Sequence, residues 1–161
     1  RFAACDRQST TERWQGQQHR LPTLPDHADH RITSAQVLPG PTGESNKLST
    51  VPRNALLCMG PGEKAARDQM RAVTELGGIA IACTGTIDPK TLTSGPPYGG
   101  VLWWGDEQTG RAIEQALAAR KGPIIPLIPG LPDVARVLAE RHVCVDTTAS
   151  GGNAALLSAA S

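Results

Sequence analysis

A glycine-rich turn is the first pattern in this chain whose residue types could carry chemistry. Residues 60–65 read Gly-Pro-Gly-Glu-Lys-Ala, which fits the G-x-G-x-x-[GA] fingerprint of dinucleotide-binding folds between a strand-like run and a helix-like run. Three features oppose such binding. The next strand ends at Cys83 without an acidic residue, Pro61 lacks a backbone N–H, and the Glu63 carboxylate would repel a pyrophosphate at the helix N-terminus. We therefore interpret the turn as a tight strand-to-helix connection.

Glu75 is the second candidate, because a carboxylate near a nucleophilic thiol can act as a general base. Residues 75–78 read Glu-Leu-Gly-Gly, a string similar to the one that carries the general-base glutamate in aldehyde dehydrogenases. That chemistry also needs a cysteine a few dozen residues later. The cysteines that follow, Cys83 and Cys144, lie at other spacings and inside strand-like runs. We therefore interpret Glu75 as the end of a helix that Gly77 terminates.

Histidine and cysteine patterns indicate no metal centre. Residues 26–30 read Asp-His-Ala-Asp-His, but they lie in a polar segment and no further cluster completes a ligand set, so we interpret them as a solvated loop. The cysteines form no C-x-x-C pair. Three of them lie in apolar runs, which is typical of buried free thiols in a reducing compartment. The four cysteines are Cys5, Cys58, Cys83 and Cys144.

The remaining candidates add no site. His142 heads a strand-like run and has no visible partner. Residues 40–47 (GPTGESNK) lack the second glycine before the lysine, and the following helix, that a phosphate loop needs. No G-x-S-x-G elbow occurs. The prediction is therefore that this chain contributes no catalytic, cofactor-binding or metal-binding residue.

Composition narrows the classes of function. The 161 residues include 16 Lys+Arg and 15 Asp+Glu, for a formal net charge of +1, which argues against nucleic-acid binding. No apolar run approaches the roughly 20 residues that a membrane span needs. The chain begins at Arg1, its first methionine is Met59, and no signal-like segment follows the start. We therefore expect a processed product or a piece of a longer cytoplasmic protein.

The chain divides into three parts by character. Residues 1–53 are polar and Pro-rich and sustain no periodicity, so we predict an irregular segment with a short helix at 11–18 and turns at 38–46. Such a segment would become ordered only against a partner surface. Residues 54–146 are predicted to form the folded domain, and residues 147–161 a Gly/Ala-rich tail.

Short apolar runs alternate with amphipathic segments from residue 54 onward. This alternation predicts an α/β fold, a small Rossmann-like open parallel sheet of about five strands and three helices. Trp103 and Trp104 should point to opposite faces of one strand, leaving one indole for a neighbouring domain. The expected strands are 55–59, 79–83, 101–104, 123–128 and 142–146, and the expected helices are 63–76, 107–120 and 131–141.

Three stretches resemble one enzyme family. Residues 38–46 (LPGPTGESN), 101–106 (VLWWGD) and above all 145–157 (VDTTASGGNAALL) are similar to the C-terminal region of proline utilisation A, or PutA. That family comprises the bifunctional bacterial flavoenzyme and aldehyde dehydrogenase of proline breakdown. The resemblance covers about residues 37–161.

The resemblance implies a segment without chemistry of its own. The parent would oxidise proline to pyrroline-5-carboxylate with FAD, and then L-glutamate gamma-semialdehyde to glutamate with NAD. This segment would be its non-catalytic aldehyde-dehydrogenase-like domain and tail, which support the catalytic aldehyde dehydrogenase domain and cover the substrate tunnel. Both cofactors would bind elsewhere in the parent, which is expected in the cytoplasm or peripherally at the inner membrane.

Two other functions stay open from the residues alone. A free-standing nucleotide-binding domain would use the Gly60-Pro61-Gly62 turn. A scaffold module would bind another protein through an exposed tryptophan and the apolar tail.

Overall fold

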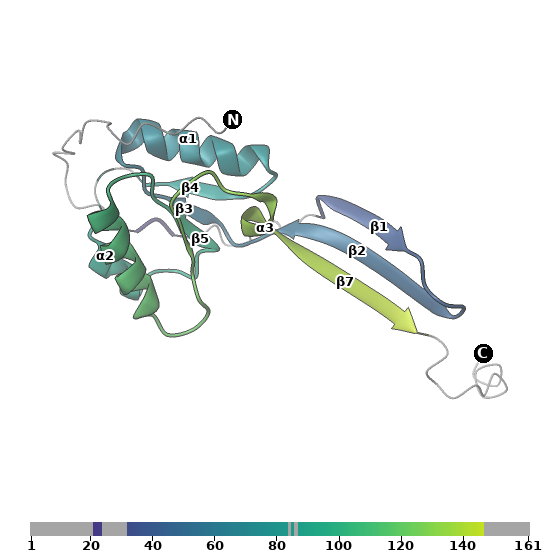
Figure 1. The fold of residues 1–161 in the computed structure, drawn as a ribbon. Helices are drawn as coiled ribbons and strands as arrows, with labels where there is room; N and C mark the ends of the chain where they lie inside the picture. The colour runs from purple at the N-terminus through teal and green to yellow at the C-terminus, as the bar shows by residue number, and fades with distance from the viewer. Residues whose placement is uncertain (1–20, 24–31, 84, 86, 147–161) are drawn as a thin grey trace. The chain divides into compact units, whose positions relative to one another are not determined.

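Two sheets organise the described part of the chain (Figure 1). The structure, a computed structural model, describes residues 21–23, 32–83, 85 and 87–146. Contacts divide the chain into two compact units, Arg1–His30 with Pro52–Ala139 and Arg31–Val51 with Glu140–Ser161. The predicted division into a segment 1–53, a domain 54–146 and a tail 147–161 stays a prediction.

The first unit contains a four-stranded parallel sheet with the order β4-β3-β5-β6. The two central strands, β3 and β5, are buried throughout, which is typical of parallel strands covered on both faces. This confirms the predicted open parallel sheet, with four strands in place of the expected five. The strands are β3 (Leu56–Cys58), β4 (Ala80–Ala82), β5 (Gly100–Leu102) and β6 (Leu127–Ile128).

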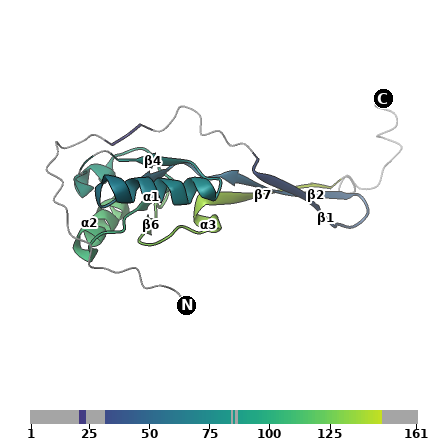
Figure 2. The same ribbon diagram turned by 90° about the horizontal axis from the view of Figure 1, so that it is seen from above.

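Helices cover both faces of this sheet. One face packs on α1 (Gly62–Glu75) and the single turn α3 (Val134–Val137), through Val73 and Val137. The other packs on α2 (Glu107–Ala118) and the 3-10 helix η1 (Pro89–Thr93), through Ile113 and Leu92. Figure 2 shows α1 alongside β4. The core is therefore aliphatic, as the low aromatic content requires.

The two long helices begin and end where the sequence predicts. The Asp106 carboxylate accepts from the backbone N–H of Thr109 at 2.8 Å and caps α2. That bond holds the pKa of Asp106 below its usual range. Gly77 has a φ of 83° after the end of α1, and its N–H donates to the Thr74 carbonyl. The left-handed conformation explains why glycine stands there.

Arg120 and Tyr98 hold the segment between β4 and β5 in place. The Arg120 guanidinium, just after α2, donates to the carbonyls of Leu92, Gly95 and Pro96. The Tyr98 hydroxyl, with the ring 3% exposed, donates to the carbonyl of Pro22. Burial is the main cause that raises the pKa of Tyr98 to about 12. Arg120 therefore holds the backbone between β4 and β5, and Tyr98 links that segment to Pro22.

The second sheet is antiparallel and has the order β1-β2-β7. Strand β1 (Ser34–Leu38) pairs with β2 (Glu44–Pro52), with Leu38 opposite Asn46 and Ser34 opposite Thr50. Gly43, with a φ of 92°, lies in the turn between them. The turn predicted at 38–46 is thus confirmed, but the irregular structure predicted on both sides of it, at 34–52, is wrong. Hydrogen bonds between the paired strands stabilise this sheet, although the local sequence lacks the periodicity from which strands are predicted.

After residue 130, one element prediction is wrong and another is confirmed as a strand but lies in the other sheet. The helix predicted at 131–141 is limited to Val134–Val137, and the strand predicted at 142–146 is part of β7 (Leu138–Asp146). Strand β7 lies beside β2, so it is not the fifth strand of the parallel sheet. The chain leaves the helix at Leu138, whose φ of −111° and ψ of 152° are extended. Pairing with β2 therefore overrides the helical spacing of the apolar residues.

The two tryptophans lie as predicted on opposite faces of the parallel sheet. Trp103 packs against the cluster under α2, and Trp104 against the cluster under α1. Both are half-buried, and their indole N–H groups donate to the carbonyls of Asp106 and Gly130 at 3.0 and 2.7 Å. Both rings are therefore partly covered, whereas the scaffold alternative expects an exposed tryptophan. No helix within the described ranges is long and apolar enough to cross a membrane.

Candidate functional site

The turn between β3 and α1 is the candidate site that both motif and fold select. Gly60 and Gly62 have φ values of 91° and 83°, which glycine adopts without strain. A Cβ atom at Gly60 would lie 2.5 Å from the nitrogen of Gly62. The two glycines are thus required by a close backbone approach within the turn, independently of any ligand.

Gln69 fills the inside of this turn. Its side chain is fully buried, its Oε1 accepts from the N–H of Gly60 at 2.9 Å, and its Nε2 donates to the Gly60 carbonyl at 2.7 Å. The side-chain amide therefore satisfies both polar groups of the first motif glycine. An N–H already paired in a buried position is unavailable to a phosphate without the loss of that bond.

The turn lies at the point where ligands bind in open parallel sheets. In the order β4-β3-β5-β6, the strand that follows β3 in the chain, β4, lies on one side of it, and the next strand, β5, lies on the other side. The crevice expected for a ligand therefore opens beyond the carboxyl ends of β3 and β5. There the N–H of Trp104 donates to the carbonyl of Gly60 at 2.9 Å. This bond continues the β3–β5 ladder beyond the strand ends and ties the start of the glycine turn to the residues after β5.

The N-terminus of α1 has few groups to offer an anion. Pro61 is its N-cap residue and has no N–H to donate. Glu63 lies in the first turn, where its carboxylate complements the helix dipole. Arg67 contacts Glu63 at 2.5 Å across one turn, and both side chains are largely exposed, so the pair adds little stability. These groups favour a self-sufficient helix start.

The end of β4 also lacks the carboxylate expected to hold a ribose. Cys83 follows the strand, and its N–H donates to the Cys58 carbonyl at 2.9 Å. The next acidic residue, Asp88, accepts from the N–H of Lys90 at 2.9 Å and caps η1. Asp88 is therefore explained by local structure, as the cap of η1.

Two of the three described cysteines are buried, and their thiols are unreactive. Cys58 and Cys83 lie in different core clusters on opposite faces of the parallel sheet. Burial raises the pKa of both thiols to about 12, and Cys83 adds to the effect on Cys58. Both stay protonated at neutral pH and are poor nucleophiles. Cys144 is exposed on β7, so its predicted burial is wrong, and Cys5 lies outside the described residues.

The other residues that the sequence offers as site candidates do not come together in one site. Glu75 is the exposed last residue of α1, His142 is exposed on β7, and residues 40–47 form the β1–β2 turn and the start of β2. Residues 26–30 lie outside the described ranges. Within the described part of the chain, no three His, Cys, Asp or Glu side chains are grouped to hold a metal ion. A shallow depression of about 210 Å³ lies between the end of α2 and β6 and includes no residue of the Gly60 turn.

Sequence reasoning missed two residues, Gln69 in the Gly60 turn and Arg120 beside the segment between β4 and β5. Gln69 stands between Ala66 and Val73 on the buried face of α1, so the signal was a lone amide on an apolar helix stripe. Arg120 follows the last turn of α2, where a cation is expected for its charge alone. What each one bonds depends on chain segments far away, which local pattern does not reveal.

The fold and the site together define an α/β domain of the nucleotide-binding type whose first motif glycine is bonded to the buried Gln69 side chain. No known family model matches the chain. It is 30% identical over 145 residues to the Bifunctional protein PutA of Salmonella typhimurium, covering 76% of this chain and 11% of that protein. The PutA of Escherichia coli K12 gives the same identity and coverage. This chain is therefore homologous to a segment of the bifunctional PutA proteins.

Further relatives carry the same name. The PutA of Klebsiella aerogenes is 26% identical over 140 residues, covering 72% of this chain and 11% of that protein. The crystal structure of a bifunctional PutA is 26% identical, with a TM-score of 0.48, over 62% of this chain and 14% of that one. A mutant of Bradyrhizobium japonicum PutA gives the same four values. The chain thus spans about a tenth of the curated relatives that it matches.

Proposed function

We propose that this chain is a non-catalytic segment of a proline-catabolic oxidoreductase. Homology to PutA supports the parent activity, the oxidation of proline to glutamate through pyrroline-5-carboxylate. In this proposal, FAD and NAD act in other parts of the parent. The segment supports the catalytic aldehyde dehydrogenase domain and covers the substrate tunnel, in the cytoplasm or peripherally at the inner membrane.

The observation that carries the proposal is the closure of the Gly60 turn. NAD would place its pyrophosphate over this turn and its ribose at the end of β4. The Gly60 N–H is bonded to Gln69, the Trp104 N–H is bonded to Gly60, and no carboxylate ends β4. The residues present therefore do not fit the cofactor that the fold type commonly binds. A fold of this type without a fitting site supports a structural role.

The proposal is tested by shortening the parent protein. Deleting Gly151–Ser161 is expected to lower the rate of semialdehyde oxidation and to leave flavin-dependent proline oxidation unchanged, because the two reactions use separate sites. Both rates are measured on one preparation, so the proline reaction is the internal control. Equal losses of both rates would contradict the proposal and indicate a general role in folding.

A nucleotide-binding function is the second candidate, and one observation favours it. The G-x-G-x-x-A string stands between a parallel strand and a helix, which is the context that the motif requires. If the turn bound a nucleotide, Gly62→Trp would abolish that binding while leaving the parent's proline oxidation intact. The proposed segment has no such binding to lose.

A further inference from the structure

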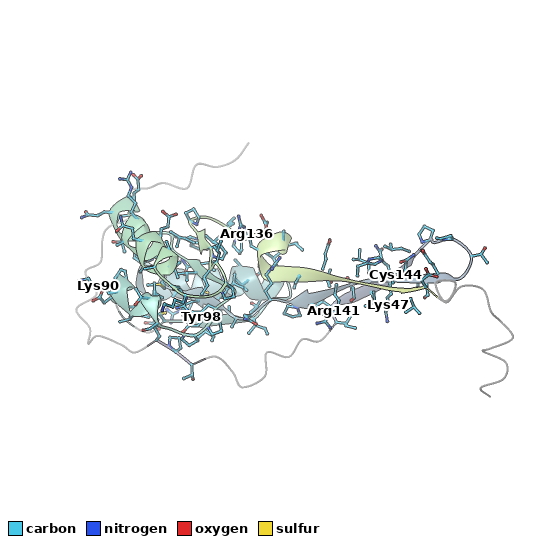
Figure 3. All side chains as sticks on the ribbon, turned by 90° about the horizontal axis from the view of Figure 1, so that it is seen from below. Lys47, Lys90, Tyr98, Arg136, Arg141 and Cys144 are labelled. Atoms are coloured by element: carbon cyan, nitrogen blue, oxygen red, sulfur yellow. The ribbon has the colours of Figure 1, made fainter. Side chains whose placement is uncertain are left out.

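A short stretch near the start of the chain, residues 21–23, packs on the unit that contains the parallel sheet and is here named the Leu-Pro stretch. Leu21 is partly buried against the core cluster under α2. The carbonyl of Pro22 accepts from the Tyr98 hydroxyl at 2.5 Å. Tyr98 is labelled in Figure 3. The stretch is neither helix nor strand, so side-chain packing and the Tyr98 bond attach it to the unit without a sheet ladder.

The backbone that receives the Leu-Pro stretch is fixed by contacts of its own. The Arg120 guanidinium donates to the carbonyls of Gly95 and Pro96. Asn54 Nδ2 donates to the Pro97 carbonyl at 2.9 Å. None of these bonds involves the Leu-Pro stretch, so they hold the receiving surface in place independently of it. A preformed surface loses little conformational entropy when it binds a ligand.

Gly95 provides the space that the leucine fills. A Cβ atom built on Gly95 would overlap Cδ1 of Leu21, whereas the next atoms, Arg120 Nη1 and the Thr91 carbonyl oxygen, would lie 3.7 Å away in ordinary contact. The φ of Gly95 is not positive, so the backbone conformation there does not require glycine. The missing side chain therefore serves to admit Leu21.

The sequence of the Leu-Pro stretch is that of an extended proline segment. Proline fixes its own φ at about −65° and biases the residue before it to an extended conformation, so little freedom is lost on binding. Residues 21–26 read Leu-Pro-Thr-Leu-Pro-Asp, a repeat of three residues that matches the period of polyproline II. Residues 22–25 thus fit the P-x-x-P pattern, and aromatic-lined grooves are the surfaces that bind it.

We propose that Gly95 and Tyr98 form a docking site for an extended leucine-proline segment, and that residues 21–23 of the same chain are its occupant. The sequence predicts that residues 1–53 become ordered only against a partner surface, and for the Leu-Pro stretch that surface belongs to its own chain. A tethered segment has an effective concentration of the order of millimolar, so it excludes free peptides at lower concentration. The site therefore accepts another leucine-proline segment once its own is released. This inference does not depend on the proposed function.

The test uses Tyr98, which is the one tyrosine in the chain. Its O-acetylation by N-acetylimidazole is followed by mass spectrometry in the 161-residue chain. Leu21→Asp is expected to speed the reaction by about tenfold or more, because the charge opposes the apolar contact and the hydroxyl then reacts in most molecules. Gly95→Ala should also speed it, because the added methyl displaces Leu21. The matched control is Gly130→Ala, whose Cβ meets no atom within 4 Å and should leave the rate unchanged.

Rescue by a separate peptide distinguishes a binding site from a general loss of packing. An N-acetylated peptide of residues 18–26, added to the Leu21→Asp chain at millimolar concentration, is expected to bring the rate to within about twofold of the unchanged chain. The control peptide carries Leu21→Asp and Leu24→Asp and should give no protection.

Three results would overturn the inference. The first is an equal Tyr98 rate in the unchanged chain and in both the Leu21→Asp and Gly95→Ala variants. The second is a failure of the residue 18–26 peptide to protect, which would make the contact packing without a separable site. The third is protection of the unchanged chain that grows with protein concentration, which would identify a second copy as the source of the segment.

Discussion

Replacing Gln69 by leucine is expected to lower the free energy of unfolding by about 2–4 kcal/mol. Leucine has a similar volume, but it leaves the buried N–H of Gly60 without a partner and removes one of two bonds to its carbonyl. The cost combines two lost hydrogen bonds with the desolvation of an unpaired donor. Because Gly60 belongs to the motif turn, the substitution destabilises the candidate site itself.

Urea unfolding measures this effect, followed by tryptophan fluorescence, to which Trp103 and Trp104 on the two faces of the parallel sheet contribute. Gln115→Leu is the matched control, because Gln115 is exposed on α2 and should change stability by less than about 0.5 kcal/mol. Equal unfolding midpoints for the Gln69 and Gln115 variants would contradict the role assigned to the buried amide.

Replacing Arg120 by methionine is the change with the second largest expected effect. Methionine keeps the apolar stem but loses every bond to the carbonyls of Leu92, Gly95 and Pro96. Hydrogen bonds from a charged donor are worth more than neutral ones, so a loss of about 2 kcal/mol is expected for this partly exposed group. Hydrogen exchange should speed up most over residues 91–98.

Lys121→Met removes a neighbouring exposed cation and is the control for charge alone. Arg120→Lys keeps the charge without the planar fork and should give an intermediate loss of stability. If Lys121→Met and Arg120→Met changed stability and exchange equally, net charge rather than carbonyl bonding would be the cause.

The parallel sheet could be predicted because its signals are local. The apolar run before Gly60, the periodic segment before Gly77 and the cap at Asp106 each specify an element within a few neighbouring residues. Strand β7 could not be predicted in the same way. The sequence predicts a helix to residue 141, but residues 138–141 are strand because β2, far earlier in the chain, provides a pairing partner.

The candidate site was predictable in part. Glycine spacing located the turn, and Pro61, Glu63 and Cys83 are the residues from which the sequence argues against a nucleotide. The three bonds to Gly60, two with the Gln69 amide and one from the backbone N–H of Trp104, join residues that only the fold brings together. Sequence could thus indicate that the motif was incomplete, but not what fills it.

Calorimetric titration of this chain with NAD tests the central claim most directly. The claim is that the Gly60 turn is closed by Gln69 and Trp104 and takes no dinucleotide, so no saturable heat is expected at micromolar to submillimolar NAD. A dissociation constant in the micromolar range, lost on Gly62→Trp, would contradict the account and establish the turn as a working nucleotide site.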